Sequence, residues 1–182
     1  KKQKLLFSLP IISGLVKKKV LKQLGLDYCR AALTGAAPLS ADIVNWYRNL
    51  GLELLGVYGM SENFGYSHAN RPGQARAGSV GMANPGVEHR IGEGGEVQVK
   101  SPGQMLGYYK NEEKTKEDLT EDGFLKTGDM GEIDRDGTLR ITGRVKDLFK
   151  TSKGKYVVPV PIENRFNHPK AEGVCVAGAN QP

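Results

Sequence analysis

Two patterns of apolar and polar positions follow each other along the chain. The first pattern, of helices and strands in turn, covers roughly the first 60 residues. Apolar side chains recur at about helical spacing in two segments and form short continuous runs in two others. Ser40 and Gly51 are well suited to begin and end the second helix. The pattern predicts helices at 5–24 and 41–50, and strands at 29–33 and 52–57. This order is typical of a parallel α/β unit, which binds ligands in the loops after its strands.

The second pattern follows residue 70, where short strand-like runs are separated by glycine-containing turns. Many short strands with such turns are typical of a small antiparallel barrel or sandwich. One acidic helix, at 112–119, interrupts them, and a further helix is expected to begin near Pro161. The predicted strands are 79–82, 88–91, 96–100, 124–126, 130–133, 138–142 and, near the end, 174–177.

One hairpin in this region places two charged residues together. The segment 134–137 (Asp-Arg-Asp-Gly) is suited to a tight turn between its two strands. An antiparallel return should therefore bring Asp129 and Arg144 close to each other. A carboxylate accepts hydrogen bonds from a ribose diol, and a guanidinium donates several to an anion. A surface salt bridge is the simpler explanation when this pair is considered alone.

Composition and charge limit the kind of protein. The 182 residues are 38% hydrophobic and 25% charged, which is ordinary for a soluble chain. The net charge of +6 favours anionic partners. Seven lysines precede the first acidic residue, and such a basic start suits either a membrane or nucleic-acid contact or, more simply, a solvated helix face. These lysines are Lys1, Lys2, Lys4, Lys17, Lys18, Lys19 and Lys22.

Cysteine usage and the absence of long apolar runs favour a cytoplasmic protein. Cys29 and Cys175 match neither a disulfide nor a metal-binding pattern, so a reducing compartment is expected. No apolar run approaches the length of a membrane span. Pro10 and Lys17 interrupt the first apolar stretch, which argues against a signal peptide. The predicted localisation is cytoplasmic, with peripheral membrane contact through the lysine-rich start as an addition.

Several common functional motifs are absent. Residues 59–63 resemble a hydrolase nucleophile elbow, but Asn63 stands where the last glycine is needed. The chain has no GxxxxGK[ST] phosphate loop. Its histidines, His68, His89 and His168, lack metal-ligand spacing. Basic residues are not interleaved with aromatic ones, so nucleic-acid binding is not expected.

Three loops on different elements remain as candidates for chemistry. Residues 35–37 are small enough to lie flat against a purine, and Tyr58 could stack on its other face. Ser61 and Glu62 could reach a phosphate and a Mg²⁺ ion, while Asp129 could hold ribose hydroxyls. Each has a structural alternative, since tyrosines such as Tyr58 often only pack and acids such as Glu62 often only begin a helix. The order of the loops is what makes the set informative.

In that order, the chain resembles the adenylate-forming superfamily of acyl-CoA synthetases, luciferases and peptide-synthetase adenylation domains. Five segments carry the resemblance: TGAAPLS at 34–40, YGMSE at 58–62, GEVQVKSPGQMLGYYKNEEKT at 95–115, TGD at 127–129 and GRVKDLFK at 143–150. Two stretches, LKQLGLDYCRAALTGAAPLS and KTSKGKYVVPVPIEN, are most similar to bacterial long-chain fatty acyl-CoA synthetases.

The resemblance implies a role for each matching position. Gly35, Ala36, Ala37 and Tyr58 would contact adenine, Ser61 would contact phosphate, and Gly59 is included among the cofactor-binding residues. The remaining residues are implied to bind the metal or the ribose, or to belong to the hinge and the domain that moves. Glu62 would hold Mg²⁺ and act in catalysis, Asp129 would bind ribose, Arg144 would contact ribose or phosphate and act in catalysis, Lys146 would lie at a hinge, and Gly154 and Lys155 would approach the site during thioester formation.

The implied reaction joins a fatty acid to CoA in two steps, with ATP, AMP and Mg²⁺ as cofactors. The implied fold is an α/β remnant, a small antiparallel β-barrel-like subdomain and the start of a small α+β domain. The expected boundaries are 1–70, 71–142, a hinge at 143–150, and 151–182. The incomplete α/β unit would leave apolar surface exposed or paired with a second copy, as a homo-oligomer.

The family's phosphate loop and its C-terminal catalytic lysine have no counterpart in these 182 residues. We therefore expect a fragment that is inactive alone. Two alternatives stay open. One is another adenylating ligase, such as a fatty acyl-AMP ligase or an enzyme for aryl or amino acids. The other, from a different class, is a basic module that binds membranes or nucleic acid.

Overall fold

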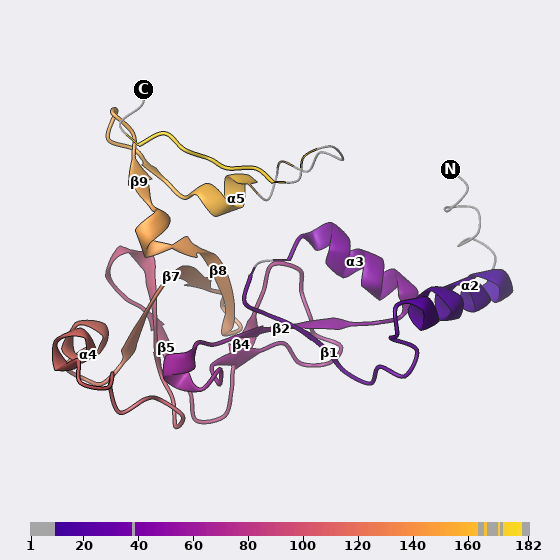
Figure 1. Cartoon of the computed structure of the whole chain (residues 1–182), viewed down its shortest axis with the longest axis horizontal. Helices are drawn as coiled ribbons and strands as arrows, with labels where there is room; N and C mark the ends of the chain where they lie inside the picture. Colours follow the sequence, from indigo (N-terminus) through magenta and orange to yellow (C-terminus); the bar gives the residue numbers. More distant parts are fainter. Residues whose placement is uncertain (1–9, 38, 164–165, 167–170, 172, 180–182) are drawn as a thin grey trace.

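The computed structural model describes residues 10–37, 39–163, 166, 171 and 173–179 of the chain. In this described part, eight strands form one sheet in the order β1-β2-β3-β4-β8-β7-β6-β5 (Figure 1). Strands β1 and β2 are parallel, and every other neighbouring pair in this sheet is antiparallel. The fold is therefore a mixed sheet accompanied by helices.

The parallel end of the sheet has the elements that the sequence predicted. It contains α2 (Pro10–Gln23), β1 (Ala32–Thr34), α3 (Ala41–Leu50) and β2 (Leu54–Tyr58). The bounds of α3 agree with the prediction because its two ends are capped. The Ser40 side chain accepts a hydrogen bond from the backbone of Ile43, and Gly51 adopts a left-handed conformation with φ of 93°. Residues 5–9 of the predicted first helix lie outside the described residues, and β1 begins three residues later than expected.

The antiparallel end is built from short strands, as expected. These are β3 (His68–Ala69), β4 (Gly81–Ala83), β5 (Glu88–Ile91), β6 (Glu96–Lys100), β7 (Leu125–Ile133) and β8 (Thr138–Arg144). Two predicted strands merge into β7, because Lys126 and Met130 both pair with β6 and the register shifts across the three residues between them. Asp129, one of these three, pairs with Arg144 of β8. Three short 3₁₀ segments and one helix lie between strands: η1 (Ser61–Asn63), η2 (Glu93–Gly95), η3 (Val145–Asp147) and α4 (Glu112–Asp118).

The prediction of a separate barrel-like unit is wrong in one respect. Strand β3 was not predicted, and it pairs with both β2 and β4, so the α/β part and the antiparallel part share one sheet. The sheet curls without closing: β3 and β5 are not neighbours in it, yet His68 and His89 on these strands meet through their ring nitrogens at 2.6 Å. The boundary expected at residue 70 stays a prediction.

The core lies inside the curled part of the sheet. Val97, Val99, Leu125 and Leu139 are fully buried and contact one another. Tyr58 packs against this cluster from the end of β2. The apolar interior of the antiparallel part therefore directly supports Tyr58, the last residue of the second parallel strand.

The C-terminal segment differs from the prediction in its details. A small hairpin of β9 (Phe149–Lys150) and β10 (Tyr156–Val157) was not predicted. Helix α5 (Pro159–Glu163) begins two residues earlier than expected and packs against β8, above which it lies in Figure 1. The described residues 173–179 form no strand, so the strand predicted at 174–177 is wrong. No helix among the described residues is long and apolar enough to cross a membrane.

Candidate functional site

The first two candidate loops lie side by side at the carboxyl ends of β1 and β2. Thr34 is the register partner of Gly56, so the chain leaves both strands at the same edge. A Cβ atom on Gly35 would lie 3.0 Å from Cγ2 and 3.1 Å from the carbonyl oxygen of Val57, which shows how closely the loops approach. Ala36 has a φ of 67°, a left-handed conformation that costs energy in a residue other than glycine. The structure thus places the loop that begins at Gly35 against the end of β2, whose last residue is Tyr58.

Asp129 links these loops to the hairpin. Asp129 and Arg144 are register partners, and the Nε atom of Arg144 lies 3.2 Å from Oδ1 of Asp129. The Tyr58 hydroxyl donates to the other carboxylate oxygen, Oδ2, at 2.8 Å. The Asp129 side chain is 13% exposed and that of Arg144 is 66% exposed. The three residues therefore form one connected cluster with a solvated basic rim.

Neighbouring groups hold this cluster in place. The Thr127 hydroxyl donates to the backbone carbonyl of Val97 at 2.8 Å and accepts from the backbone N–H of Asp129 at 3.1 Å. Burial, reinforced by the negative charge of Asp129, raises the pKa of Tyr58 far above its ordinary value. The phenol consequently remains protonated and acts as a donor to the carboxylate.

Glu62 belongs to a second polar cluster. It lies in η1, directly after the exposed Ser61. The Tyr108 hydroxyl is 2.9 Å from Oε1 of Glu62 and 3.0 Å from Oδ2 of Asp118 in α4. No hydrogen bond or ion pair within the described residues engages the second oxygen of Glu62, Oε2. This carboxylate therefore keeps one oxygen for a ligand.

The loop that carries Ser61 and Glu62 is closed by its own backbone. A Cβ atom on Gly59 would lie 2.5 Å from the backbone of Gly65, so only glycine fits there. Asn63 is fully buried, and its side-chain oxygen accepts from the backbone N–H of Met60 at 2.9 Å. Asn63, which breaks the hydrolase motif, thus holds the loop shut. The cofactor-binding role of Gly59 stays a prediction, whereas its packing against Gly65 is visible.

Three predicted site residues lie apart from these clusters. Lys146 is exposed in η3. Gly154 and Lys155 belong to the turn between β9 and β10, where their backbone N–H groups donate to Thr151. Among the described residues, no hydrogen bond or ion pair connects these three positions to Tyr58, Asp129 or Glu62. Lys146 nevertheless stands two positions after Arg144, and η3 contacts β7, so within the described part of the chain only Gly154 and Lys155 have no such link to the rest of the predicted site.

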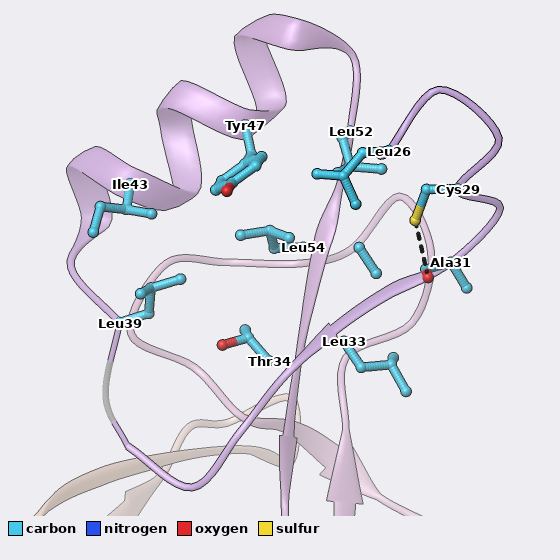
Figure 2. Close-up of a pocket in the computed structure, with 11 residues that line it drawn as sticks. Leu26, Cys29, Ala31, Leu33, Thr34, Leu39, Ile43, Tyr47, Leu52 and Leu54 are labelled. Atoms are coloured by element: carbon cyan, nitrogen blue, oxygen red, sulfur yellow. Dashed lines mark hydrogen bonds between the residues drawn. The ribbon is translucent and has the colours of Figure 1, made fainter. Parts of the chain in front are cut away.

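An open, largely apolar hollow of about 500 Å³ lies between α3 and the two parallel strands (Figure 2). Ile43 and Tyr47 of α3 face Leu54 of β2 across it. None of its lining residues is charged, and the polar groups that Figure 2 shows include Thr34 and the Cys29 thiol, which donates to the Ala31 carbonyl at 3.3 Å. The hollow offers apolar surface beside the 35–37 loop rather than acid–base chemistry.

Sequence reasoning missed Tyr108, Asp118 and Thr127 as members of the polar clusters. Tyr108 lies in a segment that the motif order had singled out, but the adjacent Tyr109 is 89% exposed, and the sequence gives no signal that separates the two. Asp118 looked like part of an acidic solvated helix face.

Among the described residues, no group of three or more histidine, cysteine, aspartate or glutamate residues could hold a metal ion by itself. A metal at Glu62 would therefore need further ligands from a substrate or water.

Comparison with known proteins decides the family. A sequence profile described as AMP-binding enzyme matches residues 8–109. The chain belongs to this AMP-binding enzyme family. Its relatives include the long-chain-fatty-acid–CoA ligase FadD15 of Mycobacterium bovis, 39% identical over 173 residues, which cover 94% of this chain and 28% of the relative. The long-chain-fatty-acid–CoA ligase ACSBG2 of Gallus gallus is 40% identical over 155 residues, which cover 82% of this chain and 20% of the relative.

Solved structures agree with this family membership. ATP-bound MatB from Rhodopseudomonas palustris is 39% identical, with a TM-score of 0.68 over 74% of this chain and 29% of that one. The o-succinylbenzoate CoA synthetase MenE of Bacillus subtilis, in complex with ATP and a magnesium ion, is 28% identical, with a TM-score of 0.74 over 82% of this chain and 34% of that one. The AMP-binding chain thus spans about a quarter of the length of the curated relatives it matches.

Proposed function

We propose that this AMP-binding chain contributes the ribose and metal contacts of an AMP-forming fatty acyl-CoA synthetase. Two kinds of observation support the proposal. The motif order is that of adenylate-forming enzymes, and several relatives are named long-chain-fatty-acid–CoA ligases. The single observation that carries it is the joining of Tyr58, Asp129 and Arg144, from β2, β7 and β8, into one cluster.

The residues present fit a nucleotide. Oδ2 of Asp129 accepts a hydrogen bond from Tyr58 and Oδ1 forms the ion pair with Arg144, so each oxygen keeps a lone pair that can accept from a ribose hydroxyl. The Arg144 guanidinium is 66% exposed and has several N–H donors, so it can donate to a phosphate while its Nε stays paired with Asp129. Gly35, Ala36 and Ala37 have small side chains or none and follow β1 close to the end of β2, so an adenine ring would find room between them and Tyr58.

Glu62 fits a Mg²⁺ ion for a chemical reason. Mg²⁺ prefers oxygen ligands and commonly takes one or two carboxylates, water and substrate phosphates, which suits a single carboxylate with one open oxygen. When bound, the ion would offset negative charge that develops on the phosphates. Glu62 would hold it, and Ser61 would contact a phosphate oxygen.

The chemistry is acyl transfer in two steps. The fatty acid carboxylate attacks the α-phosphorus of ATP, and pyrophosphate leaves with the electron pair of the broken P–O bond. The CoA thiolate then attacks the acyl carbonyl, and AMP leaves. Asp129 and Arg144 would keep the nucleotide fixed through both steps, which lowers the barrier by orientation and by electrostatic stabilisation.

The moving parts of the family are part of the same proposal. Residues 143–150 would form a hinge around Lys146, and 151–182 would belong to a small domain that brings Gly154 and Lys155 toward the site for thioester formation. The separation of these residues from the ribose cluster supports this view, because they would have to travel to reach it. The domain boundaries at 70 and 142 and a cytoplasmic location belong to the proposal as well.

The exposed lysines of α2 support a proposed peripheral contact with anionic lipid. Lys18, Lys19 and Lys22 are all exposed, and the first turn of α2 contains no acidic residue. Binding to anionic vesicles that falls steeply as salt rises would support the contact. Equal binding to neutral and anionic vesicles would contradict it.

The proposed function is tested by ATP affinity, measured by calorimetry on the parent chain and on Asp129→Ala. Loss of a charge-assisted hydrogen-bonding group should weaken binding roughly tenfold or more. Asp134→Ala is the matched control, because Asp134 also pairs with an arginine of β8, Arg140, but at the far end of the hairpin. Equal ATP affinity in the parent and Asp129→Ala would contradict a ribose site at Asp129.

A further inference from the structure

Tyr108 places one phenol between two carboxylates. Its hydroxyl oxygen lies 2.9 Å from Oε1 of Glu62, which is 46 positions away in sequence, and 3.0 Å from Oδ2 of Asp118. A phenol has one proton and can donate to only one of the two acceptors at a time. The two carboxylates therefore compete for this proton, and the outcome decides how Glu62 is held.

The charge around each carboxylate decides the competition. The Lys114 ammonium group lies 2.7 Å from Oδ1 of Asp118 and also binds Glu117 at 2.9 Å. Asp118 is thus already compensated by a cation, which makes it the weaker acceptor. Glu62 forms no ion pair within the described residues. The Tyr108 hydroxyl therefore donates its hydrogen bond to Glu62, because the negative charge of Glu62 is less compensated than that of Asp118.

The backbone around Tyr108 fixes the position of the phenol. The backbone N–H of Tyr108 donates to the Thr115 hydroxyl at 2.9 Å, and a Cβ atom on Gly107 would lie 2.9 Å from the Thr115 methyl group. On the other side, the backbone N–H of Met105 donates to the Glu62 carbonyl at 2.7 Å. Both ends of the contact are tied to rigid segments, so the hydroxyl reaches one Glu62 oxygen and leaves the other open.

We propose that Tyr108 is a positioning residue that orients the Glu62 carboxylate for a divalent cation, and that Lys114 supports it by keeping the phenol proton directed to Glu62. This inference rests on the proposed function, in which Glu62 binds the metal. Tyr108 itself need not touch the cation, because it acts through Oε1 of Glu62.

The experiment measures binding of the Mn²⁺–ATP complex, a paramagnetic probe, to the chain by the enhancement of water-proton relaxation, which distinguishes Mn²⁺ held on the protein from Mn²⁺ held by ATP alone. Tyr108→Phe should weaken Mn²⁺ binding roughly tenfold, as expected for loss of a hydrogen bond to a charged group. Tyr109→Phe removes the same hydroxyl one residue away, from an exposed ring, and should leave the affinity unchanged. Equal Mn²⁺ affinity in Tyr108→Phe and the parent would overturn the inference.

A double-mutant cycle separates positioning from a general structural effect. Glu62→Gln should weaken Mn²⁺ binding, and adding Tyr108→Phe to it should change the affinity by less than twofold, because the residue through which Tyr108 acts is already altered. If Tyr108→Phe still costs its full effect in the Glu62→Gln background, the tyrosine acts in another way and the inference fails. Unfolding midpoints in urea are recorded for every variant, and a folded Tyr108→Phe chain is expected.

A lysine pair tests the supporting step without changing the tyrosine. Lys114→Met leaves the negative charge of Asp118 without its cation. Asp118 should then accept the hydrogen bond from the Tyr108 hydroxyl in place of Glu62, and Mn²⁺ binding should weaken severalfold. Lys116→Met removes the same charge from an exposed position of α4 and should have a much smaller effect. Equal losses in the two lysine variants would contradict the role of Lys114.

The results also separate the inference from the proposed function. If the parent chain binds neither ATP nor Mn²⁺, both fail. If the parent binds them and Tyr108→Phe has no effect, only the inference fails.

Discussion

The Tyr58 hydroxyl donates to Asp129 at 2.8 Å across a separation of 71 positions in the sequence. This hydrogen bond connects the end of a parallel strand to the antiparallel hairpin. It places the aromatic ring and the carboxylate of the candidate nucleotide site in a fixed relation before any ligand arrives. Such preorganisation reduces the entropy that binding must overcome.

Tyr58→Phe should destabilise the chain by about 1–2 kcal/mol, because it removes the donor to Oδ2 of a largely buried carboxylate. Urea unfolding at neutral pH measures the change. The control is Tyr66→Phe, which deletes a hydroxyl whose contact with the Pro85 carbonyl is exposed and 3.4 Å long. That control should stay within about 0.5 kcal/mol of the parent. Equal effects of the two substitutions would argue that the Tyr58 hydroxyl is not a structural contact.

Stability should fall on acidification because of His68. Burial, with a smaller contribution from His89, lowers the pKa of His68 to about 3, whereas the unfolded chain binds a proton there near pH 6.5. Between these values only the unfolded state gains the proton, so the free energy of unfolding drops by up to about 1.4 kcal/mol for each pH unit below 6.5. Above that pH this contribution is complete and constant.

Urea unfolding of the parent and of His68→Gln between pH 7 and about pH 4 checks this dependence. The variant should lose less stability over the range, although its carboxylates will still contribute a slope. Parallel curves for the two chains would show that His68 does not titrate differently in the folded state.

Gly81 should tolerate no side chain. Its φ is 89°, and a Cβ atom would lie 2.1 Å from the backbone of Ala69 on β3. Gly78 has a similar φ of 78° but open space around it. Gly78→Ala should therefore cost only the left-handed conformation, about 1–2 kcal/mol, while Gly81→Ala should cost a further 1–3 kcal/mol or so as β3 and β4 are forced apart. Thermal or urea unfolding of both variants measures the difference, and equal losses would contradict the crowding.

Arg144→Lys should lower ATP affinity severalfold with little change in stability. Lysine keeps a positive charge near the largely buried Asp129 carboxylate, and the Arg144 side chain is 66% exposed, but lysine cannot reproduce the planar guanidinium donors. Arg140→Lys, in the same strand and paired with Asp134, is the matched control and should bind ATP like the parent. Calorimetry on the two variants decides between a specific contact and a general effect of charge, since an equal loss in both would point to the latter.

Local chemistry made much of the fold predictable. Helix α3 agrees with its predicted bounds because Ser40 and Gly51 cap it, and the end of β5 and the start of β6 agree because Gly92 and Gly95 lie in the turn between them. The meeting of Asp129 and Arg144 followed from hairpin geometry alone. These features depend on residues that are close in sequence.

The features that were missed depend on residues far apart. The two-residue β3 has no apolar pattern, and it forms because β2 and β4 both offer it hydrogen bonds. The contact of His68 with His89 depends on how strongly the sheet curls, which no local pattern specifies. Tyr108 and Tyr109 are chemically identical, and only the packing of Gly107 on Thr115 decides which of them faces Glu62.

The curled sheet can open between β3 and β5 without breaking a backbone ladder. Between β3 and β5, the His68–His89 hydrogen bond joins strands that share no backbone ladder. Opening there would leave every pair of neighbouring strands intact. Local opening should therefore occur most often between β3 and β5. Amide hydrogens of β5 should exchange with solvent earlier than those of β7, which has a partner strand on each side.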